Sequence, residues 1–311
     1  MTCPSTGVGF SPRSGLVQSI ATFVRDFSLE ATRPSAAEVA ALVGTAPAGT
    51  RVYVSAVPAR PAHESIAAAT RLRAAGFEPV PHLAVRNFAT VALIDDFLAR
   101  MTGEAGVQRF LVIAGDREQP AGEFRAAIDV IDGALLRRRG IVEIGLAGYP
   151  DGHPRISQQD LDLALMEKIN AVESTGLSIH IVTQFCFHPA ATIAWLAKLR
   201  DFGVEHPVRI GLAGPTSLAS LMRYASRCGV QATAHSLARH AGLARQLFAM
   251  WTPDTLVRAL AEARSEGHLG ELKPHFFSFG GLLPTARWAQ AVAQGRLTLA
   301  ADQGFRIMPT G

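Results

Sequence analysis

Two carboxylates in this sequence follow short apolar runs, where a strand end would present them to a pocket. Glu30 comes directly after the run of residues 27–29, and Asp116 follows the run of residues 110–113. A carboxyl group removed from water has a raised pKa, which suits a general acid near neutral pH. An ion pair with Arg33 explains Glu30 equally well, and an ordinary helix-capping turn is the simpler explanation of Asp116 taken alone.

Neutral polar groups stand at further positions of the same kind. Gln184 ends another apolar run, and its amide offers a donor and an acceptor, which suits the edge of a heterocycle such as a pterin. Tyr149 and His153 lie in residues 148–154, where two prolines and two glycines favour a rigid binding loop. Cys186 has no neighbouring base in the sequence, so we expect a packed thiol rather than a nucleophile.

A metal site would need several histidine and carboxylate side chains to converge. His82 also ends an apolar run, and a barrel would allow His82, Asp116 and His153 to meet. A metal-dependent hydrolase is therefore one interpretation of these residues. The three cysteines are widely spaced and form no CxxC pair, which argues against a disulfide framework or structural zinc and fits a reducing cytoplasm.

Eight short apolar runs, separated by helix-length segments, must position these side chains. The runs are residues 27–29, 52–54, 79–81, 110–113, 144–146, 179–182, 208–212 and 275–279. Ser35 and Glu38 have the spacing of a capping box, and glycines at 76, 103, 176 and 203 would stop helices. The repeat predicts an α/β protein with a single (β/α)8 TIM barrel, whose strand ends converge on one mouth. A doubly wound open sheet is the competing architecture.

The longest connection lies between the seventh and eighth runs and is predicted to be an extended helical segment. Helices are expected there over residues 217–228, 233–250 and 253–266, and elsewhere over residues 124–139 after the fourth run and 285–295 after the last. We divide the chain into a loose N-terminal extension (1–25), the barrel domain (26–300) and an uninformative C-terminal tail (301–311).

Composition narrows the class of protein further. The chain has 311 residues, 48% of them apolar, and a net charge of +4, so one barrel with a large core is expected. No apolar stretch is long enough to span a bilayer, and no signal peptide is evident. The basic run of residues 137–139 suits a helix C-terminus better than a nucleic-acid patch, because no aromatic residues accompany it.

Taken in order, these fragments resemble the methylenetetrahydrofolate reductase family. The matching pieces span roughly residues 26–190: the early strand with Glu30, and residues 81–83, 115–116, 147–154, 167–168 and 183–185. The resemblance implies a (β/α)8 barrel and an oxidoreductase of one-carbon metabolism. It implies that a hydride passes from NADH or NADPH, usually through FAD, to 5,10-methylenetetrahydrofolate and gives 5-methyltetrahydrofolate.

The resemblance also implies a role for each candidate residue. Glu30 matches the acid that protonates the leaving nitrogen, and Asp116 matches the carboxylate beside the flavin and the pterin. Gln184 matches a folate-orienting amide, with Phe185 next to it on the substrate side. The positions that match cofactor contacts are Ser55, His82, Ala114, Gly115, Tyr149, His153 and Lys168.

Several departures from the family pattern fall on the flavin side. Ala114 stands where an arginine is usual, Ser55 replaces a threonine, and residues 124–125 replace a Tyr-Ala pair. We therefore hypothesise weakened or absent FAD binding, with the nicotinamide donating its hydride directly to the folate. A non-catalytic folate-binding barrel that partners a methyltransferase is a further interpretation. The choice between NADH and NADPH, the direction of the reaction, its biosynthetic or catabolic role and homo-oligomer formation are left open.

Overall fold

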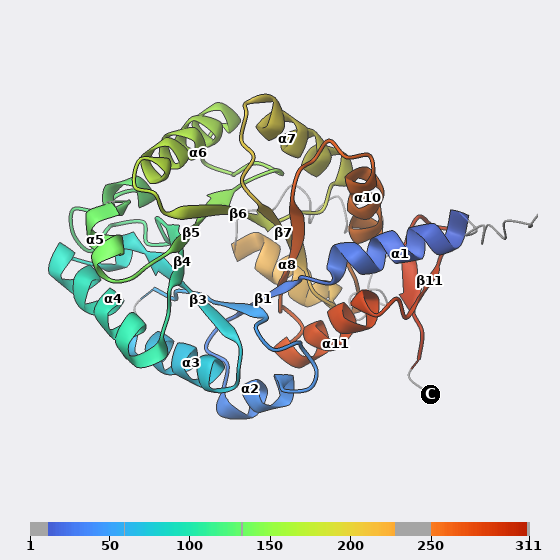
Figure 1. The fold of residues 1–311 in the computed structure, drawn as a ribbon, viewed down its shortest axis with the longest axis horizontal. Helices are drawn as coiled ribbons and strands as arrows, with labels where there is room; N and C mark the ends of the chain where they lie inside the picture. Colours follow the sequence, from blue (N-terminus) through green and yellow to red (C-terminus); the bar gives the residue numbers. More distant parts are fainter. Residues whose placement is uncertain (1–11, 59, 132, 228–249, 310–311) are drawn as a thin grey trace, which may run out of the picture.

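The computed structural model describes residues 12–58, 60–131, 133–227 and 250–309. Eight parallel strands close into a barrel in the order β1-β10-β7-β6-β5-β4-β3-β2, so the predicted barrel is confirmed (Figure 1). The strands are β1 (Ser28–Ala31), β2 (Arg51–Val54), β3 (Glu78–Ala84), β4 (Arg109–Ile113), β5 (Glu143–Gly148), β6 (Ser178–Phe185), β7 (Val208–Ala213) and β10 (Leu272–Phe277). Closure is made by β1, which pairs with β2 on one side and β10 on the other.

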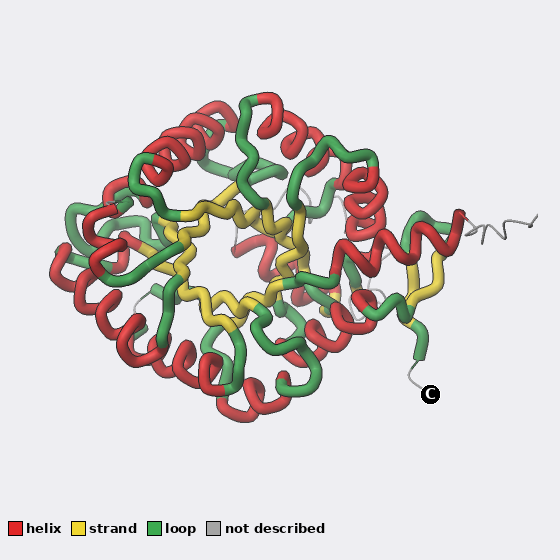
Figure 2. The backbone as a smooth tube through the Cα atoms, in the orientation of Figure 1, coloured by secondary structure: helices red, strands yellow, loops and turns green. Residues whose placement is uncertain are grey.

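Helices surround the strands as an outer ring (Figure 2). They are α2 (Ala36–Leu42), α3 (Ala62–Ala74), α4 (Val91–Ala105), α5 (Gly133–Arg138), α6 (Gln158–Glu173), α7 (Pro189–Asp201), α10 (Asp254–Ser265) and α11 (Leu282–Ala293). Helix α8 (Leu218–Arg227) instead lies across one end of the barrel (Figure 1). The capping box of Ser35 and Glu38 forms as predicted at the start of α2. Helix α4 continues past Gly103 and ends at Gly106, whose left-handed backbone at φ 57° suits glycine.

Along each strand, successive side chains point alternately into the barrel interior and into the layer beneath the helices. In β2, Val52 and Val54 join the apolar core under the helices, whereas Tyr53 lies inside the barrel with Val80 of β3 and Leu111 of β4. Side chains two residues apart share one face of a strand. Glu30 therefore lies with Ser28 on the interior face of β1. The candidate site is built on this face.

The N-terminal segment differs from the loose extension that we predict over residues 1–25. Residues 12–24 form helix α1 (Pro12–Val24), which lies against α10 and α11 (Figure 1). Ile20, Phe23 and Val24 are buried in the main apolar core. Burial of these side chains stabilises a helix whose weak amphipathic pattern gives little signal by itself.

The predicted helix over residues 124–139 is wrong in its first half. Residues there form a short 3₁₀ turn, η2 (Ala127–Val130), before helix α5 begins. Asp129 accepts hydrogen bonds from the backbone N–H groups of Arg125 and Ala126, at 2.6 and 2.9 Å. An aspartate that satisfies nearby backbone donors competes with a continuous helix.

The connection between β7 and β10 is not wholly helical. Strand β8 (Thr216–Ser217) pairs antiparallel with β9 (Met250–Trp251), and α8 and α10 form close to their predicted ranges. The helix predicted over 233–250 lies outside the described residues apart from Met250, which belongs to β9.

The C-terminal tail also has structure that the sequence does not predict. Strands β11 (Leu297–Leu299) and β12 (Phe305–Ile307) form a hairpin, and Phe305 stacks on Trp288 with ring centroids 5.8 Å apart. None of the helices among the described residues is long and apolar enough to cross a membrane.

Candidate active site

Glu30 occupies the C-terminal end of β1 and is bound by side chains from three other strands or the residues that directly follow them. Ser55, just after β2, donates a 2.6 Å hydrogen bond to Oε1. His275 of β10 lies with Nε2 3.2 Å from Oε2, and His82 of β3 places its Nε2 3.3 Å from the same oxygen. The sequence alternative fails, because Arg33 pairs with Glu64 at 2.9 Å. Glu30, Ser55 and His82 were all predicted site residues, and the structure brings them together.

The charge state of Glu30 differs from the sequence expectation. Burial alone raises the pKa of this carboxyl, but the neighbouring His82 and His275 outweigh it and lower the pKa well below its ordinary value. The Glu30 carboxylate is therefore ionised at neutral pH. The expectation of a raised pKa omitted the two imidazoles, which only closure of the barrel brings to Glu30.

His275 and Tyr53 also belong to this site, although no motif in the sequence marks them. Both are fully buried, and their rings meet edge to face with centroids 4.6 Å apart. The Nδ1 atom of His275 lies 3.0 Å from the Ser28 hydroxyl on the paired strand β1. Alternation within residues 272–277 was the available signal, since it places His275 on the interior face with Lys273 and Phe277.

The N-terminal half of the barrel interior holds a second, more strongly charged cluster. Glu143 of β5 accepts two hydrogen bonds from Arg51, at 2.7 and 2.9 Å, and one from Arg109, at 2.7 Å. His180 of β6 lies with Nδ1 2.7 Å from Glu143, and its Nε2 pairs with the Tyr53 hydroxyl at 2.7 Å. The interior of this barrel is therefore polar at one end, where such barrels are usually filled by branched apolar side chains.

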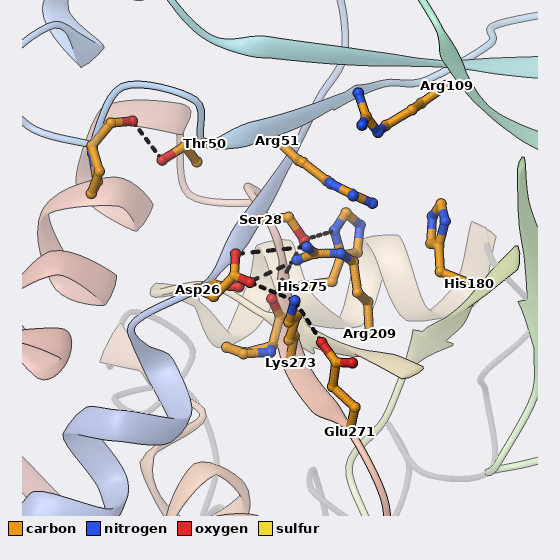
Figure 3. A network of polar contacts seen from close by, with 12 residues as sticks. Asp26, Ser28, Thr50, Arg51, Arg109, His180, Arg209, Glu271, Lys273 and His275 are labelled. Atoms are coloured by element: carbon orange, nitrogen blue, oxygen red, sulfur yellow. Dashed lines mark hydrogen bonds and ion pairs between the residues drawn. The ribbon is translucent and has the colours of Figure 1, made fainter. Parts of the chain in front are cut away.

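Neighbouring strands extend this charged cluster. Figure 3 shows Arg209 and Lys273 on adjacent strands reaching toward Asp26, which precedes β1. The distance from Lys273 Nζ to Asp26 is 2.7 Å. Burial lowers the pKa of His180 to about 4, even though Glu143 opposes that effect. His180 is thus neutral at neutral pH, and these groups serve to hold the strands together.

The loop after β4 presents the second predicted carboxylate. Asp116 is exposed and makes no hydrogen bond or ion pair with another described residue. Gly115 has φ 91°, and a Cβ there would lie 2.9 Å from the Cβ of Ala84 on β3. Glycine is therefore required for this loop to lie against β3. The backbone oxygen of Ala114 accepts a 3.0 Å hydrogen bond from the N–H of Arg86.

Gln184 and Phe185 stand at an irregularity in the pairing of β6 with β7. The Gln184 Oε1 atom accepts a 3.1 Å hydrogen bond from the Phe185 N–H. Phe185 is fully buried, in ring contact with Phe187, Phe277 and Phe279 at 5.0–5.5 Å. Because the ring of Phe277 also contacts His275 at 5.0 Å, these rings connect the predicted folate side to Glu30.

The aromatic rings beside β6 and β10 are covered by α8. Its Ala225 is fully buried against Phe185, and its Met222 packs on the same cluster. Tyr224 stacks on Phe279 with centroids 4.2 Å apart and an 11° angle between planes. Helix α8 therefore closes this side of the barrel mouth. Cys186 is fully buried, and burial raises the pKa of its thiol to about 12, consistent with a packed role.

The remaining predicted cofactor residues are not joined to Glu30 by any contact in the described part of the chain. Tyr149 and His153 pack ring against ring at 5.6 Å, and His153 Nδ1 accepts a hydrogen bond from the Arg155 N–H. Lys168 is half-buried on α6, and burial lowers the pKa of its amine. Its Nζ forms no ion pair with another residue that the structure describes.

The metal-site interpretation receives no support from these positions. His82 contacts Glu30, His153 contacts Tyr149, and Asp116 faces solvent. Within the described ranges, no group of three or more histidine, cysteine, aspartate or glutamate side chains could hold a metal ion.

The residues around Ala114 test how well a flavin would fit. Arg86 is the neighbouring cation, but its guanidinium is bound to the backbone oxygens of Arg125 at 2.6 Å and Arg117 at 3.3 Å. It therefore does not replace the arginine that the resemblance expects at 114. Phe124 is buried in the apolar core instead of facing the mouth. The described part of the chain therefore offers no free guanidinium beside residues 114–115.

Comparison with known proteins gives a consistent set of relatives. A family model described as methylenetetrahydrofolate reductase matches residues 39–246. Methylenetetrahydrofolate reductase 2 of Saccharomyces cerevisiae is 29% identical over 164 residues, covering 50% of this chain and 27% of the yeast protein. The 5,10-methylenetetrahydrofolate reductase of Pectobacterium carotovorum is 25% identical over 158 residues, covering 50% of each. The chain thus matches at most half the length of these relatives.

A solved structure supports the architecture. An uncharacterized protein from Clostridium thermocellum that binds two copies of 5-methyl-5,6,7,8-tetrahydrofolic acid superimposes with a TM-score of 0.56. The superposition covers 89% of this chain and 97% of that protein, with 12% sequence identity. At this identity the likeness concerns the fold alone.

Proposed function

This chain belongs to the methylenetetrahydrofolate reductase family, and on that premise we propose that it interconverts 5,10-methylenetetrahydrofolate and 5-methyltetrahydrofolate by hydride transfer. The reduced folate would bind at the C-terminal mouth of the barrel, where chemistry takes place in this fold. The observation that carries the proposal is the Glu30 carboxylate, placed at that mouth between a hydroxyl and two imidazoles.

Glu30 would act as the acid in this reaction. When the five-membered ring of the folate opens, a carbon–nitrogen bond breaks and its electron pair goes to nitrogen, which takes up a proton. An acid in this role must exist both with and without its proton near neutral pH. Ser55 would hold Oε1, which leaves Oε2 as the oxygen that gains and loses the proton.

Asp116 and Gln184 would bind the substrate. Asp116 is exposed and without a partner among the described residues, so its charge is available to a positively charged intermediate of the folate. Gln184 uses Oε1 on the backbone of Phe185, which leaves its amide N–H groups to donate to the pterin edge. Phe185 and its neighbouring rings would form the apolar floor beside this amide.

The cofactor side would use residues 114–115 against the reacting ring, together with Ser55, His82, Tyr149, His153 and Lys168. NADH or NADPH supplies the hydride when bound, directly or through FAD. The engaged guanidinium of Arg86 and the buried ring of Phe124 support the direct route. Lys168 is half-buried and forms no ion pair within the described ranges, so it would pair with a phosphate of the dinucleotide.

The test has two parts. Freshly purified protein should show no flavin absorption bands, and folate-dependent oxidation of NADH or NADPH should proceed without added FAD. Flavin bands, or turnover only with FAD, would overturn the direct route and leave the reductase proposal standing. Folate binding without turnover under any of these conditions would instead indicate the non-catalytic barrel. Absence of both binding and turnover would contradict the proposal as a whole.

A further inference from the structure

His275 is the buried titratable group that the family resemblance and the motifs leave without a role. It is fully buried, yet both of its ring nitrogens are engaged. Nδ1 lies 3.0 Å from the Ser28 hydroxyl, and Nε2 lies 3.2 Å from the Glu30 carboxylate. A histidine buried for packing alone needs only one partner for its single N–H. Full engagement of the ring by a hydroxyl and a carboxylate indicates a more specific function.

The orientation of this ring is fixed on all sides. Ser28 and His275 are direct partners in the register of β1 and β10, so both project into the barrel at the same level. Tyr53 packs against the ring at a 69° interplanar angle and Phe277 at 79°, with centroids 4.6 and 5.0 Å away. The imidazole therefore keeps Nε2 directed at Glu30.

Ser28 allows the ring to change protonation state without losing a partner. The hydroxyl can donate to an unprotonated Nδ1, or it can accept from a protonated Nδ1 and turn its own hydrogen toward the backbone oxygen of Pro274, 3.4 Å away. In the doubly protonated ring, Nε2–H donates to the Glu30 carboxylate; once Nε2 has released that proton, the neutral ring keeps Nδ1–H, which donates to the Ser28 hydroxyl. The pair is thus suited to hold a proton next to Glu30 and to release it.

We propose, on the basis of the proposed function, that His275 is a positioning residue that orients Glu30 and supplies its proton. Ser28 holds the imidazole ring in this orientation through Nδ1. When both ring nitrogens carry a proton, the proton on Nε2 of His275 moves to Oε2 of Glu30, and Glu30 passes it to the leaving nitrogen of the folate. His275 is then neutral and regains a proton from solvent through Glu30, whose side chain is 11% exposed.

Other groups act on the same site and must be followed in any pH study. Those that face Glu30 and His275 in the described residues are His82 from β3, Tyr53 from β2 and Arg209 from β7. Burial lowers the pKa of His275, and the Glu30 carboxylate opposes that effect. Removal of the Glu30 charge should therefore lower the pKa of His275 further.

The first experiment measures the pH dependence of kcat for the wild type, His275→Gln and Ser28→Ala. Glutamine keeps an N–H donor near Glu30 but cannot titrate, so we expect kcat to fall about 100-fold and the limb of the pH profile that His275 contributes to be lost or displaced. Ser28→Ala should lower kcat about 10-fold and shift the same limb, with KM nearly unchanged. His206→Gln is the matched control, because His206 pairs with Glu173 at 3.0 Å outside the site. Unchanged pH profiles in both site variants would overturn the proposal.

The second experiment does not depend on turnover. Imidazole nitrogen shifts of histidine-labelled wild type and Glu30→Gln, followed by NMR between about pH 5 and 9, report the titration of His275 directly. We expect the His275 pKa to fall in Glu30→Gln. An identical titration in both proteins would overturn the coupling, even if the wild type has no activity. If the wild type shows no reductase turnover but the His275 pKa still responds to the Glu30 charge, only the proposed function is contradicted. If His275→Gln does not fold, Ser28→Ala and this titration still decide the proposal.

Discussion

Two glutamates inside the same barrel show how different partners adapt one side chain to two purposes. Glu30, at the C-terminal end of β1, is held by Ser55 and two histidines. Glu143, at the start of β5, is held by two arginines and one histidine. Burial alone would raise the pKa of either carboxyl, but these neighbours lower both below the ordinary value. The important difference is whether the partners can lose their charge.

A guanidinium stays charged at every pH at which a protein is folded, whereas an imidazole loses its charge near neutral pH. Glu143 is therefore a permanent anion that ties β5 to β2, β4 and β6. Glu30 has partners that can gain and lose a proton, so its own proton affinity can change with them. The mouth of the barrel is suited to proton transfer, and its opposite end is suited to stability.

Glu30→Gln should give the largest effect, and it should fall on turnover. The substitution keeps the shape of the side chain but removes the acid, so we expect kcat to fall at least about 100-fold. Folate binding, measured by equilibrium titration, should change by less than about tenfold. Turnover close to the wild-type value would remove Glu30 from the role of acid and would end the distinction between the two glutamates.

Glu143→Gln should instead affect folding. Removal of this charge leaves Arg51 and Arg109 facing each other in a largely buried site, so we expect the free energy of unfolding to fall by about 3 kcal/mol. Urea denaturation measures it. Glu104→Gln is the matched control, because its partner Arg100 is exposed on α4, and the expected loss there is under about 0.5 kcal/mol. Equal losses in the two variants would show that the interior cluster contributes no special stability.

Acid should destabilise the protein in two stages. The pKa of His180 is about 4 in the folded chain and near its ordinary 6.5 when unfolded, so the unfolded chain binds more protons in that interval. Stability should therefore fall as the pH drops from about 6.5 to 4. Below the ordinary glutamate pKa of about 4.3, the lowered pKa of Glu143 adds a further loss. His180→Gln should show a flatter first stage in unfolding measurements at several pH values, and an unchanged slope would contradict this assignment.

Gly145→Ala should give the smallest effect of these variants. It should reduce the stability that the Glu143 cluster provides and leave turnover unchanged. A Cβ at 145 would lie 2.7 Å from Nε2 of His180, which is held between Glu143 and Tyr53 and has little room to move. We expect a loss of about 1–3 kcal/mol in thermal or urea unfolding, with kcat nearly unchanged. Gly103→Ala in α4 meets no atom within 4 Å and should be neutral or stabilising. A larger effect on kcat than on stability would connect the two ends of the barrel.

Local signals in the sequence were sufficient for most of the architecture. Each strand, loop, helix and stop is specified within about thirty residues, so the eight-fold repeat could be recognised without knowing any long-range contact. Helix α1 and the β11–β12 hairpin were missed because docking on the barrel, more than local pattern, stabilises them. Likewise, Asp129 redirects a predicted helix through hydrogen bonds that its sequence neighbours alone do not indicate.

The sequence predicts which residues belong to the site better than it predicts which of them contact one another. The sequence placed Glu30, Ser55 and His82 at strand ends, and the structure joins them. It placed Asp116 and Gln184 at such ends as well, and their roles stay predictions. The sequence did not distinguish residues that face the barrel from residues that end a strand, so His275 in mid-strand was overlooked.

By itself, the sequence determined the order of strands and helices, the position of Glu30 at a strand end and membership of a reductase family. Only the tertiary structure decided the partners of the two glutamates. Closure of the barrel sets β1 beside β10 and brings His275 to Glu30 across 245 residues of chain. Whether a carboxyl group meets imidazoles or guanidiniums depends on such long-range neighbours, and they determine whether it exchanges a proton or stays charged.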